Sequence, residues 1–215
     1  MNTLFYYPGN ASMAPHILLE EIGQPFELKL VDRERNEHKS ADYLKLNPNG
    51  LIPVLADGDF VLYESAAICL HLADTHPGSA LAPALGTPQR AEFYKWLMWL
   101  TNTLQSTLIA YFYPERWVDA ENAEGARQVQ ARAEAKIVTL LDQLEAQLET
   151  SGGPWLLGET YSALDPYTLM LCRWTRVLHR PARTWPRIGA YLQRMLERPA
   201  VVRAYKTEQI SQPLV

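Results

Sequence analysis

The run Asn47–Leu55, NPNGLIPVL, and the run Tyr63–Ile68, YESAAI, carry the strongest structural signals in the chain. Residues 47–50 form a dense turn signal, because Asn, Pro and Gly are the residues that tight turns favour. Pro53–Ala56 and Phe60–Tyr63 follow as two short strands that the Asp-Gly-Asp of residues 57–59 joins. Ser65 is expected to cap a helix. The two runs therefore predict a turn, a strand pair and a helix in succession.

The residues before this region alternate between strands and helices. Pro8-Gly9 ends the first strand, and Gly23 is a natural stop for the first helix because glycine accepts the left-handed backbone found there. The predicted strands are Thr3–Tyr7 and Phe26–Val31, and the predicted helices are 14–22, 40–46 and 65–76. The resulting order, β-α-β-α-β-β-α, describes a compact α/β unit.

The rest of the chain contains no predicted strand. A segment rich in proline and glycine separates the two parts, and apolar residues at helical spacing follow it, so the predicted division is 1–77 for the α/β unit, 78–88 for the linker and 89–215 for an all-helical unit. The predicted helices are 89–113, 121–149, one that Ser162 opens, 184–197 and 199–208. The first of them carries Phe93, Trp96 and Trp99, more apolar surface than one small domain needs, and predicts a two-fold homodimer.

Composition excludes several classes of protein. The chain has 215 residues, 47% of them hydrophobic and 20% charged, which is an ordinary globular balance. A net charge of −4 argues against nucleic acid as a partner, and no uninterrupted apolar run is long enough to predict a membrane partner. Cys69 and Cys172 lie in apolar surroundings without a CxxC motif, which indicates core residues in a reducing compartment. With no signal peptide in the first residues, we expect a cytoplasmic protein.

This arrangement of an α/β unit, a proline-rich linker and a helical unit resembles the glutathione S-transferase superfamily, whose N-terminal half is thioredoxin-like. In that family the runs at 47–55 and 63–68 form the glutathione-binding signature. The resemblance implies that Ile52 offers a strand edge to the tripeptide, that Pro53 follows a cis bond, and that Glu64 and Ser65 receive the γ-glutamyl end. A helix start suits a carboxylate. An ordinary helix cap with a solvated acid is the alternative interpretation.

A second run, Glu37–Ser40, is similar to a family loop in which a His and a Lys hold the glycyl carboxylate. His38 and Lys39 occupy those places here, and a cation is what an anionic end requires. A solvated charged loop is an equally good interpretation.

The run Tyr6–His16 is similar to the N-terminal motif of the beta class, but with Ala11 in place of the class cysteine and Gln105 where that class has a histidine. Ser12 occupies the place of the serine that activates the thiol in serine-type classes, and it stands at a helix start, so a plain helix cap is its alternative role. Asn10 is a second candidate donor to the sulfur. Tyr6 and Tyr7 are further alternatives, one facing the core and the other facing the opposite side of the sheet.

The resemblance implies a glutathione transferase that stabilises the glutathione thiolate and promotes its attack on a small hydrophobic electrophile, with a role in detoxification. Tyr111, Tyr113 and Trp117 are candidates for the electrophile pocket, with core or dimer packing as the alternative. Ser162 and Asp165 are interpreted as a structural capping box. The resemblance implies glutathione as co-substrate, and no metal is expected. Peroxidase, disulfide reductase or dehalogenase activity, and a non-catalytic binding role, are the rival functions.

Overall fold

The computed structural model describes residues 1–215 and has a four-stranded sheet at its N-terminal end. The strands are β1 (Thr3–Tyr6), β2 (Glu27–Leu30), β3 (Val54–Asp57) and β4 (Phe60–Tyr63), in the order β2-β1-β3-β4. β1 runs parallel to β2 and antiparallel to β3, which runs antiparallel to β4. The predicted strands are confirmed, with ends that differ by one residue.

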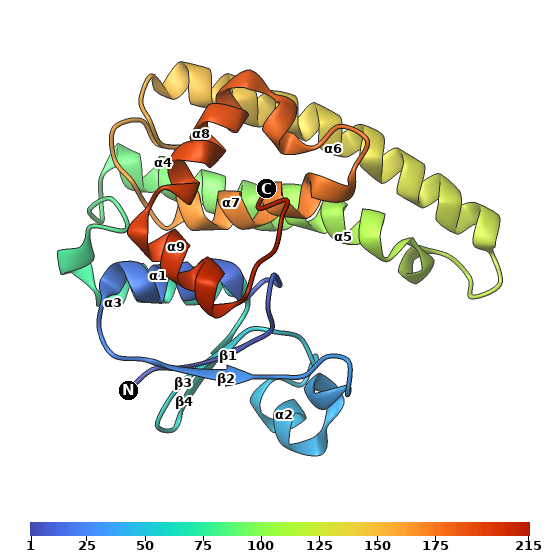
Figure 1. Cartoon of the computed structure of the whole chain (residues 1–215), viewed down its shortest axis with the longest axis horizontal. Helices are drawn as coiled ribbons and strands as arrows, with labels where there is room; N and C mark the ends of the chain where they lie inside the picture. The colour runs from blue at the N-terminus through green and yellow to red at the C-terminus, as the bar shows by residue number, and fades with distance from the viewer.

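Helices cover both faces of the sheet (Figure 1). α1 (Met13–Ile22) and α3 (Ser65–Thr75) pack on one face, where Leu4 and Leu55 join the main core. α2 (Ala41–Leu46) packs on the other face through Tyr43, which lies in a second cluster with Phe5 and Val54. This is the thioredoxin-like unit that the sequence predicts.

The remaining chain is helical, as predicted. Its helices are α4 (Pro88–Trp99), α5 (Ser106–Phe112), α6 (Ala123–Ser151), α7 (Leu164–Trp174), α8 (Pro186–Leu196) and α9 (Pro199–Thr207). The predicted helix at 89–113 is interrupted by a π-helical segment, η3 (Leu100–Gln105), between α4 and α5. Short 3-10 segments complete the chain: η1 (Glu37–Lys39), η2 (Pro77–Ser79), η4 (Pro114–Trp117), η5 (Thr175–Val177) and η6 (Ala182–Thr184).

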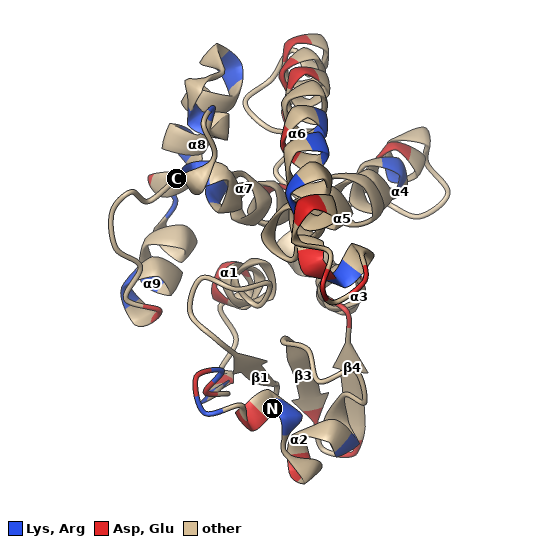
Figure 2. Cartoon of the chain, turned by 90° about the vertical axis from the view of Figure 1, so that its right-hand side faces the viewer, with Lys and Arg blue, Asp and Glu red and all other residues tan.

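One hydrophobic core runs through both parts of the chain. It contains 45 buried residues and takes in α1 and α3 from the first part and α4 to α9 from the second. α1 lies between the sheet and the helical part, where it contacts α7 and α9 (Figures 1 and 2). Charged residues lie along the helices α6 and α8 and around α2 (Figure 2). Both free cysteines are buried in this core, as predicted.

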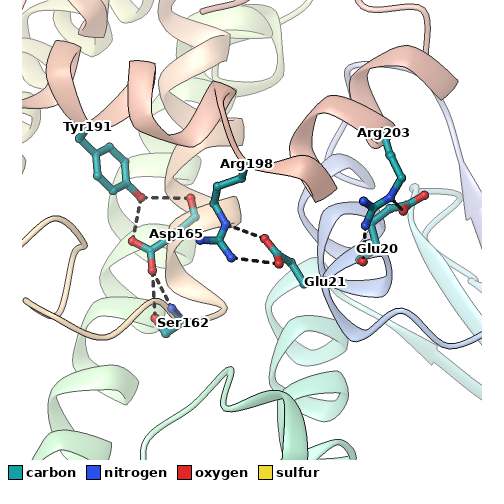
Figure 3. A network of polar contacts seen from close by, with 7 residues as sticks. All are labelled: Glu20, Glu21, Ser162, Asp165, Tyr191, Arg198 and Arg203. Atoms are coloured by element: carbon teal, nitrogen blue, oxygen red, sulfur yellow. Dashed lines mark hydrogen bonds and ion pairs between the residues drawn. The ribbon is translucent and has the colours of Figure 1, made fainter.

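Ion pairs join α1 to the C-terminal helices (Figure 3). Arg198, just before α9, donates to both carboxylate oxygens of Glu21 at 2.7 and 3.0 Å, and both side chains are largely buried. Arg203 on α9 pairs with Glu20. These contacts fix α9 against the first helix, which begins beside the candidate active site.

The structure does not support the apolar surface from which the dimer was predicted. Phe93 is fully buried and Trp96 is 8% exposed inside the chain, while Trp99 packs at the core's edge, so these aromatic residues are not a free surface. Tyr94 and Met98, on the other side of α4, are exposed instead. The homodimer itself stays a prediction. No helix of the structure has the length and apolar character needed to cross a membrane.

Candidate active site

Two cavities adjoin where the loop after β1 meets the end of α5. The polar cavity, of about 170 Å³, is lined by His38, Lys39, Ile52 and Gln105 among others. The aromatic cavity, of about 240 Å³, is lined by Tyr7, Phe112, Arg176 and Val177 among others. They form one cleft because they share five lining residues, Asn10, Arg33, Ile109, Tyr113 and Trp174.

Ile52 forms an open strand edge in the polar cavity. It lies just before β3, whose pairing with β1 begins at Val54, and its backbone N–H and C=O hydrogen bond to no other loop or side chain. The Ile52–Pro53 bond is cis, as the resemblance implies. An extended peptide can therefore add to this edge through its own backbone.

Glycine at position 50 allows the loop with His38 and Lys39 to approach this edge. Gly50 has a φ of +59°, and a Cβ there would come within 2.8 Å of the His38 carbonyl oxygen and of the Lys39 Nζ atom. Any other residue would push the loop away. The amine of Lys39 donates to the carbonyl of Asn49 at 3.3 Å, which holds it over the cavity.

The polar cavity is rich in positive charge. Lys39, Arg33 and Arg116 all line it, and no acidic side chain does. Burial, together with the charges of Lys39 and Arg33, lowers the pKa of His38 from its ordinary value. This shift favours the neutral form of His38, which can serve as a hydrogen-bonding group, while its neighbours supply the charge that an anionic ligand needs.

The start of α3 is tied to the loop before α1. Ser65 is 6% exposed, and its hydroxyl donates to the carbonyl of Ala11 at 3.1 Å. Ser65 is the first residue of α3 rather than its cap; Glu64 occupies the cap position, without a side-chain capping bond. Glu64 has a φ of 74°. This backbone conformation is strained for a residue with a side chain, and residues in strained conformations cluster at binding sites.

The Ser12 hydroxyl is committed to the backbone of Tyr7. It is fully buried, donates to the Tyr7 carbonyl at 3.1 Å and accepts from the Tyr7 N–H at 3.3 Å. It makes no capping bond to α1 and lines neither cavity. Asn10 lines both cavities; its side-chain oxygen Oδ1 accepts from the N–H of Ala11, and the N–H groups of its side-chain amide have no partner in the chain.

Tyr6 and Tyr7 face opposite sides of the sheet, as predicted. Tyr6 packs against the main core, and burial together with the charge of Glu208 raises the pKa of its hydroxyl. It lines neither cavity, whereas Tyr7 lines the aromatic cavity and its ring lies 5.8 Å from the guanidinium of Arg33.

Glu208 holds the loop between β1 and α1 from behind, and the sequence interpretation missed it. Its carboxylate is 2% exposed, accepts from the Gly9 N–H at 2.8 Å and contacts Nδ1 of His16 at 2.7 Å. The indole N–H of Trp174 donates to the Gly9 carbonyl at 3.2 Å. Residues from α1, α7 and the end of α9 therefore fix Gly9, which lines the aromatic cavity next to Asn10.

The structure brings one of the three predicted electrophile-pocket residues to the cleft. Tyr113 lines both cavities, and its hydroxyl accepts from Arg33 at 3.3 Å. Tyr111 lines neither, and burial raises the pKa of its hydroxyl. Trp117 is 61% exposed and lies in a separate groove between α5 and α6. The end of a helix exposes only some of its faces, and residue spacing does not say which one meets a neighbouring loop.

Other residues of the cleft went unrecognised in the sequence. Arg33 and Arg176 belong to charged surroundings that resemble ordinary surface turns, and Trp174 ends the apolar run of α7. Gln105 had a local signal in the beta-class resemblance. It closes η3, lines the polar cavity and accepts from the buried Tyr167 hydroxyl. Single-turn π segments inside helices gather at functional sites.

Asp165 lies away from the cleft in a buried hydrogen-bond network (Figure 3). Its carboxylate accepts from the backbone N–H groups of Ser162, at 2.7 Å, and Leu156, at 3.0 Å, and from the Tyr191 hydroxyl at 3.0 Å. Burial raises its pKa to about 6. The Ser162 hydroxyl accepts from the N–H of Leu164 at 3.3 Å, so the predicted reciprocal contact forms one residue earlier than in a standard capping box.

Comparison with known proteins agrees with this fold. Residues 2–74 match the family model of the glutathione S-transferase N-terminal domain, and residues 127–194 match that of the C-terminal domain. A glutathione S-transferase of Xanthomonas campestris is 31% identical over 208 residues, which cover 97% of this chain and 99% of the relative. The chain belongs to the glutathione S-transferase family.

Solved structures show the same architecture. A glutathione transferase of Methylococcus capsulatus is 38% identical with a TM-score of 0.83, and the alignment covers 98% of this chain and 100% of that one. A glutathione transferase homologue from Sulfitobacter, solved with bound glutathione, is 27% identical with a TM-score of 0.87, over 96% of this chain and 98% of that one. BphK, a bacterial member of the family, is 32% identical with a TM-score of 0.84, and the alignment covers 97% of this chain and 100% of that one.

Proposed function

We propose that this chain is a glutathione transferase that binds glutathione in the polar cavity and directs its sulfur toward an electrophile in the aromatic cavity. One observation carries the proposal: an open strand edge at Ile52 and a cluster of cationic side chains share a cleft with an aromatic pocket. The solved Sulfitobacter relative, which holds glutathione, supports the choice of ligand.

The tripeptide is expected to lie along the edge at Ile52. Its glycyl carboxylate then meets Lys39, with Arg33 and His38 close by. Its γ-glutamyl end meets the start of α3, where Ser65 and the first amides of the helix receive the carboxylate and Glu64 receives the amine. The cysteinyl sulfur points toward the loop at Asn10, where the two cavities meet.

The chemical step needs the thiolate of glutathione. A free thiol has a pKa of about 8.5, and lowering it by about two units requires about 2.7 kcal/mol of preferential stabilisation. We propose that the Asn10 amide donates to the sulfur, because it lines both cavities and has unused N–H groups. Ser12 and Tyr6 stay alternative donors, although the Ser12 hydroxyl is paired with Tyr7.

The sulfur then forms a bond to an electrophilic carbon, and the electron pair of the broken bond leaves with the departing group or is protonated from solvent. A route through a protein cysteine is disfavoured, because Ala11 stands in the cleft and both cysteines are buried in the core. Transfer to a carbon electrophile is therefore the activity that the cleft supports best.

Calorimetric titration with glutathione tests the binding mode. Lys39→Ala is expected to weaken binding by about tenfold or more, because it removes a hydrogen bond to a charged group. Ser65→Ala is expected to do the same, on the proposal that the Ser65 hydroxyl exchanges its bond to the Ala11 carbonyl for one to the ligand carboxylate. Lys45→Ala is the control, since Lys45 lies on nearby α2 and pairs with Asp42 at the surface. Wild-type affinity in both folded variants would contradict the proposed orientation, and absence of binding to the wild type would contradict the proposed function.

A further inference from the structure

The aromatic cavity carries two arginines without a carboxylate partner. Arg33 and Arg176 both line it, neither makes an ion pair within the chain, and no acidic side chain lines the cavity. Glu208 lies behind the loop, and its two oxygens already contact Gly9 and His16. The cavity is therefore a positively charged pocket with apolar walls.

Each of the two guanidinium groups donates one hydrogen bond within the chain and keeps further N–H groups without a partner. Arg176 donates from Nη1 to the carbonyl of Arg173 at 3.1 Å, and Arg33 donates from Nη2 to the Tyr113 hydroxyl at 3.3 Å. Buried Thr175 anchors the segment that carries Arg176. Its hydroxyl donates to the backbone carbonyl of Cys172 at 2.6 Å and accepts from the backbone N–H of Ala182 at 2.8 Å. A fixed arginine fork is suited to a carboxylate.

Aromatic and aliphatic side chains form the rest of the pocket. Phe112, Tyr113 and Trp174 line it together with Ile109 and Val177. Pockets of this kind take flat, apolar molecules, and a few fixed polar groups set their specificity. Such a pocket with arginines and no acids selects a flat molecule with a negative group.

We infer that the preferred electrophile of this enzyme is a small planar molecule that carries a carboxylate or a similar anion, which Arg176 binds with help from Arg33. The inference rests on the proposed transferase function. Arg176 is free for this role because it lines only the aromatic cavity, whereas Lys39 and His38 line only the polar cavity, where the carboxylate of glutathione is expected; Arg33 lines both.

A matched pair of electrophiles tests the inference: a chlorodinitrobenzoate, with its carboxylate opposite the chlorine, and its methyl ester. In both, the carbon–sulfur bond forms as chloride leaves with the electron pair of the carbon–chlorine bond, and the thiol proton passes to solvent. Each kcat/KM is divided by the rate constant with free glutathione, which removes the difference in intrinsic reactivity. The wild type is expected to favour the carboxylate.

Arg176→Gln should lower the normalised kcat/KM for the carboxylate by about tenfold or more and leave the ester within about twofold, because one charge-assisted hydrogen bond is lost. Arg132→Gln, at an exposed position of α6 outside the cleft, is the control and should change neither. Equal losses for both electrophiles, or a weaker affinity for glutathione in Arg176→Gln, would overturn the inference.

The same data separate this inference from the proposed function. If the wild type accelerates reaction of the ester but shows no preference for the carboxylate, the anionic class is wrong and the transferase function stands. If neither electrophile reacts faster than with free glutathione, both fail.

Discussion

Two buried carboxylates organise this molecule, and they reach very different distances along the chain. Asp165 is fully buried, and its hydrogen-bond partners are within 26 residues (Figure 3). Glu208 is 2% exposed, and its partners Gly9 and His16 are 199 and 192 residues away. Asp165 connects segments within the helical part, and Glu208 connects the C-terminal end of the chain to the loop of the candidate active site. We therefore expect Asp165 to support the fold and Glu208 to position the candidate site.

The largest effect is expected from Asp165→Ala. The substitution leaves the backbone N–H groups of Ser162 and Leu156 without a partner in the core, and the Tyr191 hydroxyl keeps only the backbone carbonyl of residue 165. Each buried donor left unsatisfied costs about 1–3 kcal/mol, so the free energy of unfolding should fall by about 3 kcal/mol or more. Urea unfolding measures it, and kcat/KM of the folded protein should stay near that of the wild type.

A loss below about 1 kcal/mol would show that the network is not structural. A large loss of kcat/KM with unchanged stability would remove the distinction between the two carboxylates.

A smaller effect on stability, and a clear effect on activity, is expected from Glu208→Ala. The loop at Gly9 loses one hydrogen bond and His16 loses its partner, which should cost about 1–3 kcal/mol of stability. Because Asn10 follows Gly9 directly, the kcat/KM for a neutral electrophile should fall by about tenfold, since small displacements in a site carry large costs.

Glu208→Gln keeps an oxygen acceptor for Gly9 and should retain most of the activity. Glu197→Gln, which changes the same charge between α8 and α9 outside the network, serves as the control. If Glu208→Ala loses stability but keeps the full kcat/KM, Glu208 supports the fold in the same way as Asp165.

The contrast also explains what the sequence could predict. The strands, α2 with its Ser40 cap and the stop at Gly23 depend on neighbouring residues, and all are confirmed. The Ser162–Asp165 contact lies within one turn and was recognised for the same reason. The lining of the polar cavity by His38, Lys39 and Ile52 followed from the family resemblance rather than from spacing.

Contacts between segments that lie far apart in the chain could not be predicted from the sequence. Nothing local distinguishes Arg33, which lines the cleft, from Arg35, which pairs with Asp32 at the surface. The Gly9–Glu208 contact depends on how α9 packs, which no neighbouring residue encodes. The aromatic residues Phe93 and Trp96 suggested an exposed face because helical spacing shows that a face is apolar, but not what covers it.

The ultraviolet absorbance of the glutathione thiolate, measured against pH, tests the central claim most directly, that this cleft binds glutathione and stabilises its thiolate. Bound to the wild type, the thiol should titrate about two units below its free value of about 8.5. Asn10→Ala should raise that pKa toward the free value. Ser12→Ala should raise it less, and Asn102→Ala, at an exposed position outside the cleft, should not change it. A bound thiol that titrates as free glutathione does in the wild type would contradict the account.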